Sequence, residues 1–148
     1  TVPPAHVEQT IKQIYGNAES GYRSGHLNAR VGLFTKDNIR RALSTIGQYN
    51  RFDGDRVADV LFEELDGLIN WDRRGCVSVG REGSPVVYIG TYLKTLDTDF
   101  ETIIEAAFRV GERTRADEVS AEYQQHDWNG DGEVSMPEQP HEIRLWWD

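Results

Sequence analysis

The sequence predicts a mainly α-helical fold, with one β-hairpin at about residues 76–89 and a helix-loop-helix unit near the C-terminal end. Three observations support this prediction. Several segments repeat apolar residues at intervals of three and four, which is the spacing of an amphipathic helix. Two runs rich in β-branched residues flank a turn that contains Gly and Pro, which is typical of a hairpin. Finally, residues 127–138 place Asp, Asn, Gly and Glu at the spacing of a metal-binding loop.

Four segments have the helical spacing, and most of them carry residues that commonly start or stop a helix. The expected helices cover residues 5–15, Thr35 to Gly47, the Asp53–Asp55 cap to about Asn70, and Asp97 or Asp99 to a break at 111–114. Residues 16–32 contain four Gly and several small polar residues, so this segment is expected to be irregular.

The hairpin is expected from two β-rich runs, residues 76–79 and 86–89, on either side of a loose turn. Helices and hairpin together divide the chain into two regions. Residues 1–96 are expected to form a helical region with the hairpin. Residues 97–148 are expected to form a helix plus the C-terminal loop unit, packed with the first region as one globule.

The composition indicates a folded protein. In 148 residues, 38% are hydrophobic and four are Trp, which allows one domain or two small ones with a sizeable core. No apolar run approaches the ~20 residues of a membrane span. The single cysteine, Cys76, excludes an internal disulfide and is expected to be a buried core residue. The chain begins with Thr1 and not with Met, which suggests a processed secreted or periplasmic form, or a fragment.

Three helices followed by a hairpin are also the order of a winged-helix protein, in which the third helix reads DNA. The expected third helix, however, has an acidic polar side, and acids repel phosphate. Its acidic residues are Asp59, Glu63, Glu64 and Asp66. The net charge of −9 also argues against a nucleic-acid partner. A winged-helix shape that contacts protein stays open.

Residues 127–138 read Asp-Trp-Asn-Gly-Asp-Gly-Glu-Val-Ser-Met-Pro-Glu and fit the template D-x-[DN]-x-[DN]-G-x5-E at every defined position. Calcium takes roughly six to eight oxygen ligands, so a short loop must wrap round the ion. Gly132 stands at the sharp turn, which would strain a residue with a Cβ. The expected ligands are Asp127, Asn129, Asp131, Glu133, Ser135 and Glu138.

This loop resembles that of the EF-hand calcium-binding family. The resemblance implies a bound Ca²⁺, an entering helix with Val119 and Tyr123 on its apolar face, and an exit helix after Glu138. Pro137 suits the first turn of a helix, but Pro140 would interrupt it, so the exit helix is short or restarts at Pro140. With only three ligand carboxylates, the site is expected to bind more weakly than a high-affinity buffer, or to be static.

A second segment, residues 70–81, imitates part of the same template. Arg74 and Arg81 stand at its fifth and twelfth positions, where their charge would repel a cation. We therefore expect one working calcium loop and at most one degenerate partner.

One feature of the first half suggests catalysis. The residues Glu19-Ser20-Gly21-Tyr22, followed by Gly32-Leu33, resemble the E-S-G-[FY] … G-L segment of lytic transglycosylases. The resemblance implies that Glu19 acts as general acid on a glycosidic bond of peptidoglycan. The other interpretation of this segment is a polar loop between two helices.

Two functions therefore compete. In the first, a non-enzymatic protein binds calcium, which orders the C-terminal region for stability or for calcium-dependent binding of a partner. The expected partner surface is the aromatic tail of Ile143, Leu145, Trp146 and Trp147. Alternatively, this tail packs onto the core and is not available to a partner. In the second function, a small secreted enzyme cleaves glycans through Glu19 and uses calcium for structure.

Overall fold

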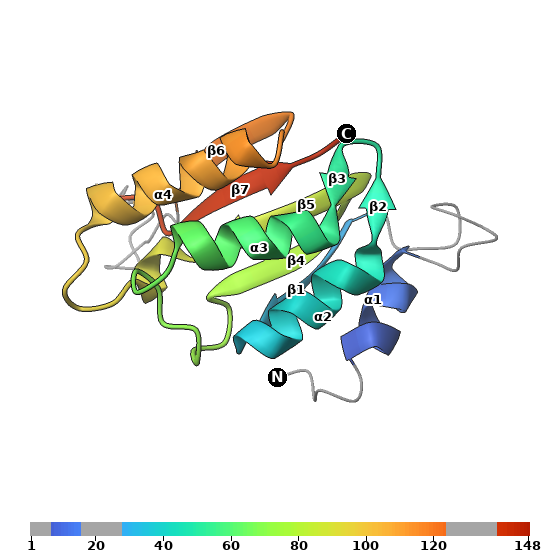
Figure 1. Ribbon diagram of the computed structural model, residues 1–148, viewed down its shortest axis with the longest axis horizontal. Coiled ribbons are helices and arrows are strands. Elements are labelled where there is room, and N and C mark those ends of the chain that lie inside the picture. The colour runs from blue at the N-terminus through green and yellow to red at the C-terminus, as the bar shows by residue number, and fades with distance from the viewer. Residues whose placement is uncertain (1–6, 16–27, 124–138) are drawn as a thin grey trace, which may run out of the picture.

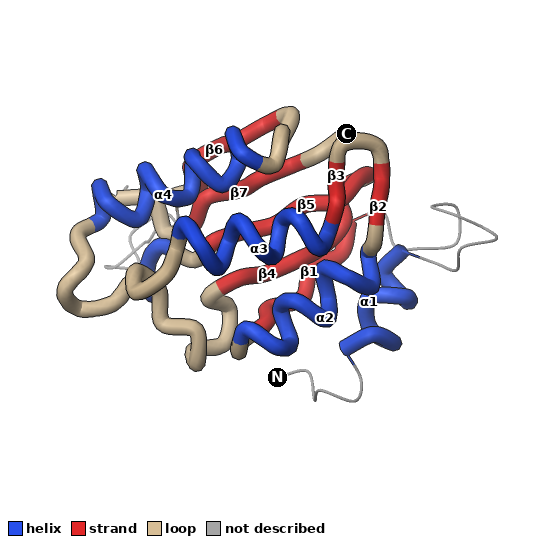
Figure 2. Tube along the Cα trace, in the orientation of Figure 1, coloured by secondary structure: helices blue, strands red, loops and turns tan. Residues whose placement is uncertain are grey.

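The computed structural model describes residues 7–15, 28–123 and 139–148. These residues form two layers, a five-stranded antiparallel sheet and a layer of helices against one of its faces (Figure 1). A separate two-stranded hairpin stands at one end of the helical layer (Figure 2).

The four predicted helices are all present. They are α1 (Val7–Tyr15), α2 (Lys36–Ile46), α3 (Gly54–Glu64) and α4 (Phe100–Arg113), with a short 3-10 helix, η3 (Thr91–Leu93), before α4. Predicted caps are confirmed at Thr35, Asp53 and Asp99, whose side chains accept hydrogen bonds from backbone N–H groups of the first turn. Gly47, with a φ of 77°, ends α2 as expected.

The described strands number seven. They are β1 (Asn28–Leu33), β2 (Gln48–Tyr49), β3 (Phe52–Asp53), β4 (Val77–Glu82), β5 (Ser84–Ile89), β6 (Glu118–Glu122) and β7 (Glu142–Trp146). The large sheet has the order β1-β4-β5-β7-β6, and every neighbouring pair in it is antiparallel. Strands β2 and β3 pair with each other between α2 and α3.

The prediction of a mainly α-helical fold with a C-terminal helix-loop-helix is therefore wrong. The described chain is an α/β fold, and both segments next to the predicted calcium loop are strands, β6 and β7. The physical reason is that buried apolar residues in β7 recur at every second position. In β7, Ile143 and Leu145 are fully buried while Arg144 between them is not, which is the alternation of a strand with one face on the core. The segment expected to be irregular also contains a strand, β1.

One helix is shorter than predicted. Helix α3 ends at Glu64, not near Asn70, because Gly67 adopts a φ of 72° that breaks the helical path. Beyond it, Ile69 forms an isolated β-bridge with Lys94, and the N–H of Asn70 donates to the carbonyl of Leu93 at 2.9 Å. The residues after Gly67 therefore pair through their backbone with residues 93–95 and do not continue the helix.

The hairpin predicted at about residues 76–89 is confirmed as β4 and β5, which join through Gly83 at a φ of 74°. It does not project from the molecule as a wing. Both of its strands lie inside the sheet, between β1 and β7, so the winged-helix arrangement is excluded.

The two faces of the sheet differ in chemistry. The face against the helices is apolar, because alternate residues of the strands meet the buried sides of the helices. Its buried residues include Leu33, Val77, Val79, Val87, Ile89, Ile143 and Leu145. No described helix covers the opposite face, which we call the open face.

Candidate functional site

The calcium template lies between two strands that pair with each other. β6 and β7 match over five residue pairs, from Glu118↔Trp146 to Glu122↔Glu142. Residues 124–138, with all six expected ligands from Asp127 to Glu138, lie outside the described residues. The metal site itself therefore stays a prediction, whereas its two flanks are established as strands.

The exit of this connection is fixed to its surroundings. The hydroxyl of Thr91 donates to the carbonyl of Pro140 at 2.5 Å, and the N–H of Tyr92 donates to the carbonyl of His141 at 3.3 Å. The N–H of His141 in turn donates to the carbonyl of Glu122 at 2.9 Å. Residues 140 and 141 are thus tied both to η3 and to the end of β6. The sequence predicts an exit helix that is short or restarts at Pro140. In the structure, Pro140 instead precedes a strand, β7.

The aromatic tail is part of the sheet and the core. Ile143, Leu145 and Trp147 have no exposed surface, and Trp146 is half-buried on the open face. The ring of Trp147 packs edge-on against Phe52 with centroids 5.0 Å apart, and its Nε1–H donates to the carbonyl of Thr114 at 2.9 Å. Of the residues expected to form a partner surface, Trp146 alone is partly accessible.

The open face carries a network of charged and aromatic side chains from five strands. Its members are Arg30, Ser78, Glu82, Tyr88, Glu118, Glu142, Arg144 and Trp146. The sequence alone does not single out this set as a polar site. A signal exists in β7, where charged and apolar residues alternate, but it becomes meaningful only once the segment is known to be a strand.

Arg30 is the centre of one half of this network. Its Nη1 donates to Glu142 Oε1 at 2.7 Å, its Nη2 donates to Glu142 Oε2, and the guanidinium lies 3.9 Å from the centroid of the Tyr88 ring. This is a bidentate pair with a stacked cation, the arrangement in which Arg binds most strongly. The Glu142 side chain is 6% exposed, so its ion pair with Arg30 compensates the burial of its charge. His141 Nε2 also lies 3.5 Å from Glu142 Oε1.

Glu82 is the centre of the other half. It accepts a hydrogen bond from the Tyr88 hydroxyl, and it accepts another from Arg144 Nε at 3.1 Å. Arg144 also lies 3.8 Å from Glu118 on β6. Cations and anions therefore alternate across the sheet, and their ion pairs stabilise the open face.

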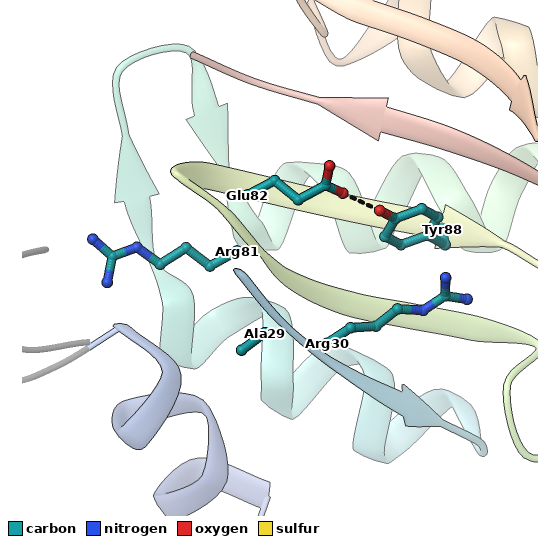
Figure 3. Close-up of a pocket in the computed structure, with 5 residues that line it drawn as sticks. All are labelled: Ala29, Arg30, Arg81, Glu82 and Tyr88. Carbon is teal, nitrogen blue, oxygen red and sulfur yellow. Dashed lines mark hydrogen bonds between the residues drawn. The ribbon is translucent and has the colours of Figure 1, made fainter. Parts of the chain in front are cut away.

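A pocket of about 410 Å³ opens between the two halves (Figure 3). It is lined by Ala29, Arg30, Arg81, Glu82 and Tyr88. The side chains of Arg30, Glu82 and Tyr88 lie together, whereas Arg81 points away from them (Figure 3). Each of these three charged or phenolic groups already has a protein partner on the open face.

The hydroxyl of Tyr88 keeps its proton to an unusually high pH. Burial, together with the hydrogen bond to Glu82, raises the pKa of Tyr88 to about 12. A raised pKa means that the folded state retains a proton that the unfolded chain releases. The contribution of this group to stability is therefore complete below its unfolded pKa of roughly 10 and is lost as the pH rises towards 12.

We expect Tyr88 to resist ionisation until about pH 12 in a spectrophotometric titration of the folded protein. Tyr88→Phe should remove this late component and leave the rest of the curve unchanged. Tyr92→Phe, at a position that is 53% exposed, is the matched control and should leave the late component in place. A late component that survives in Tyr88→Phe would contradict the assignment.

Cys76 is not a nucleophile. It is fully buried, and burial raises the pKa of its thiol to about 11. Its Sγ lies 3.6 Å from the carbonyl oxygen of Leu33, consistent with a weak donor in the core. The expectation of a buried core cysteine is confirmed.

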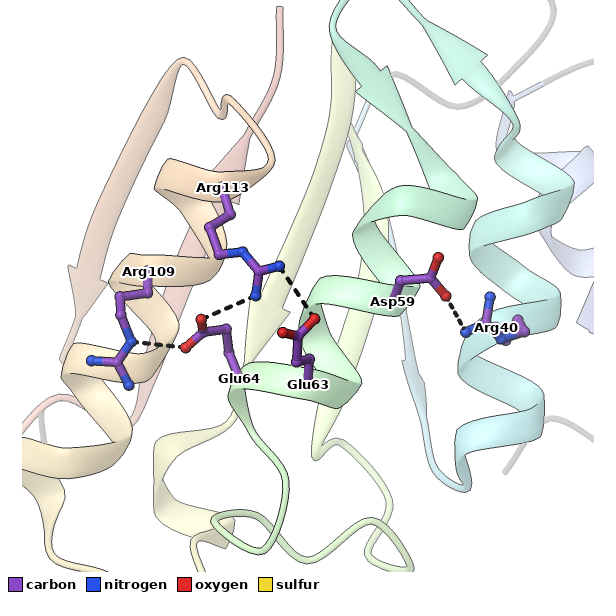
Figure 4. A network of polar contacts seen from close by, with 6 residues as sticks. All are labelled: Arg40, Asp59, Glu63, Glu64, Arg109 and Arg113. Carbon is purple, nitrogen blue, oxygen red and sulfur yellow. Dashed lines mark hydrogen bonds and ion pairs between the residues drawn. The ribbon is translucent and has the colours of Figure 1, made fainter.

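The acidic side chains of α3 form ion pairs with the neighbouring helices (Figure 4). Glu64 accepts hydrogen bonds from Arg109 Nε at 2.8 Å and Arg113 Nη1 at 3.1 Å, while Glu63 accepts one from Arg113 Nη2 at 3.2 Å. The hydrogen bond from Arg109 is the main cause that lowers the pKa of Glu64. These ion pairs join α3 to α4, and Arg40 with Asp59 joins α2 to α3 at 2.6 Å.

Glu19, the candidate general acid, lies outside the described residues, so the glycan-cleaving alternative stays a prediction. Within residues 7–15, 28–123 and 139–148, no group of three His, Cys, Asp or Glu side chains is placed to hold a metal ion. None of the helices in this part of the chain is long and apolar enough to cross a membrane. No protein-family model, curated protein or solved structure matches the chain.

Proposed function

We propose that this protein is a non-enzymatic calcium-binding domain, in which the ion closes the connection between β6 and β7 and stabilises the sheet. The observation that carries this proposal is the pairing of the two strands on either side of the template. A connection whose ends are fixed side by side has lost much of its conformational freedom before the ion binds.

The distances along the chain are compatible with a closed coordination sphere. Asp127 follows Glu122 by 127 − 122 = 5 residues, and Glu138 precedes Glu142 by 142 − 138 = 4 residues, while Glu122 and Glu142 are paired. Five extended residues reach at most ~18 Å. The first and last ligands therefore start from neighbouring points of the sheet and can converge on one ion.

The structure of the flanks favours a stabilising role over a calcium switch. A switch would have to move β7, and this strand buries Ile143 and Leu145 completely between neighbours on both sides. Exposing two such side chains costs roughly 3–6 kcal/mol, more than a weak calcium site supplies. Partner binding through the tail would be limited to Trp146, which is half-buried on the open face.

We expect calcium to raise the free energy of unfolding by about 2.7 kcal/mol at a free concentration a hundred times the dissociation constant. For a protein of this size that corresponds to roughly 5–10 °C in the unfolding temperature. Thermal unfolding with calcium and with a chelator measures the effect. Asp127→Ala and Glu138→Gln should remove both the shift and the heat of calcium in a calorimetric titration.

The matched control is Asp72→Asn, an exposed acid in the segment whose Arg74 and Arg81 exclude a metal. This variant should keep the full calcium shift. Identical unfolding temperatures of the parent protein with millimolar calcium and with chelator would contradict the proposal. A calcium-induced increase in the binding of a hydrophobic dye would instead indicate a switch and contradict the stabilising role.

A further inference from the structure

Strand β6 is an edge of the sheet. Within the described residues it pairs with β7 alone, and α4 lies beside it on the helical face (Figure 1). One side of an edge strand presents backbone N–H and C=O groups that a further strand can pair with. Proteins that bind extended peptides use such edges, with main-chain bonds for affinity and alternate side chains for selectivity.

The two faces of β6 differ in chemistry, because one carries acidic side chains and the other apolar ones. Glu118 and Glu122 lie on the open face, and the side chain of Glu118 is 58% exposed. Val119 and Ala121 lie between them on the helical face and are half-buried. An added strand would therefore meet acids with one set of alternate side chains and an apolar surface with the other.

Helix α4 extends the apolar surface beside this edge. At Gly111 it packs directly on β6, because a Cβ there would lie 2.5 Å from Val119 Cγ2. Ile104 and Phe108 stand seven and three residues before Gly111, so they share its side of the helix. Phe108 is 41% exposed. Arg109, the next residue, points instead towards Glu64 of α3 (Figure 4).

Charge decides which kind of strand fits. If a second copy of this chain paired antiparallel through β6, Glu118 and Glu122 would face acids of the same kind, which is destabilising. The net charge of −9 adds to this repulsion. Arg144 lies 3.8 Å from Glu118 but is already held by Glu82 at 3.1 Å, so it does not fully neutralise the edge. A basic strand is complementary at the same positions.

We propose that the β6 edge binds an extended segment of another protein in which Lys or Arg alternates with apolar residues, and adds this segment to the sheet as a new strand. The basic side chains face Glu118 and Glu122, and the apolar ones face Val119, Ile104 and Phe108. The residues that form this surface belong to β6 and α4, and none of them lies in the connection from β6 to β7.

The test is an NMR titration of the full chain with a seven-residue peptide of alternating Lys and Val. We expect saturable shifts at β6 and α4, and about tenfold slower hydrogen exchange of the outward amides of β6. A peptide of the same composition in block order, four Lys then three Val, should bind at least several-fold more weakly. Methylation of the peptide nitrogens that would donate to β6 should abolish binding, since it removes the strand pairing and keeps every side chain.

Paired charge variants test the acids. Glu118→Gln with Glu122→Gln should weaken the alternating peptide by roughly 2–30-fold, the range for two cross-strand ion pairs. Asp66→Asn with Asp72→Asn changes the net charge equally at exposed positions away from β6 and should leave the affinity unchanged. The proposal is overturned if both pairs of substitutions weaken binding equally. It is also overturned if the block-order or methylated peptide binds with equal affinity, or if no peptide binds at millimolar concentration. A dimer of the parent protein that forms through β6 overturns it as well.

Discussion

Replacing Trp147 by alanine is expected to lower the free energy of unfolding by about 3–5 kcal/mol, a large part of the roughly 5–15 kcal/mol typical of a folded domain. This side chain is fully buried, packs on Phe52 at 5.0 Å, and donates from Nε1 to the Thr114 carbonyl at 2.9 Å. Its removal leaves a cavity between β3 and the end of α4 and also orphans a buried carbonyl. Urea unfolding monitored by circular dichroism measures the loss.

The neighbouring Trp146 is the matched control. It lies half-buried on the open face, where its Nε1–H donates to the Glu82 carbonyl at 3.0 Å and its ring lies 5.9 Å from the Arg144 guanidinium. Trp146→Ala should therefore cost about 1–2 kcal/mol. Similar losses for the two variants would mean that Trp147 does not anchor the tail in the core, and that the tail is free for contacts with a partner.

Gly54→Ala is expected to cost roughly 3 kcal/mol, although alanine is normally the better residue in a helix. An added Cβ at this first residue of α3 would lie 1.8 Å from the carbonyl oxygen of Leu43 in α2. The carbonyl oxygen is a backbone atom and the position of the Cβ is fixed by the backbone, so the clash cannot be relieved by a side-chain rotation. The hydrogen bond from the Gly54 N–H to the Gly47 carbonyl, 2.8 Å long, would be displaced as well.

Gly67→Ala separates this steric effect from a general cost of replacing glycine. Gly67 has a φ of 72°, and no other atom lies within 4 Å of the place that a Cβ would occupy. Only the backbone preference therefore opposes alanine at this position, at about 1 kcal/mol. Thermal and urea unfolding of the two variants should rank Gly54→Ala clearly below Gly67→Ala in stability. The opposite order would show that α2 and α3 do not approach each other this closely.

The helical layer could be predicted from sequence because its signals are local. Thr35, Asp53 and Asp99 cap helices through hydrogen bonds to residues two or three positions later, and such pairs are visible in a single sequence. The β4–β5 hairpin is equally local, since its strands join through a single glycine, Gly83. Among the helix ends, the end of α3 differs most from the prediction, because apolar residues continue past Gly67.

The sheet could not be predicted because two strong local patterns point elsewhere. The calcium template is typical of a loop with helices on both sides, and the spacing of Val119 and Tyr123 is compatible with a helix. The alternation of Ile143, Leu145 and Trp147 is the better guide, since it places all three on one side of a strand. The template predicts the chemistry of the loop and does not determine the structure of its flanks.

The polar network of the open face depends on contacts that no local pattern contains. Arg30 and Glu142 form its central ion pair and are 112 positions apart in the chain. Their contact follows from the order of the strands, which brings the first and the last of the described strands into one sheet. Residues of this kind can be recognised only after the topology is known.

The order of the strands also has a consequence for how the molecule comes apart and assembles. Since β6 joins the described sheet through β7 alone, the two strands should detach and dock as one cooperative unit. The β4–β5 hairpin needs only neighbouring residues to form, whereas the docking of β7 on β5 closes a loop of more than fifty residues, as the Ile89↔Ile143 pair shows. Contacts between distant residues form slowly. An ion that holds the ends of β6 and β7 together would therefore favour the late step of folding, in addition to stabilising its product.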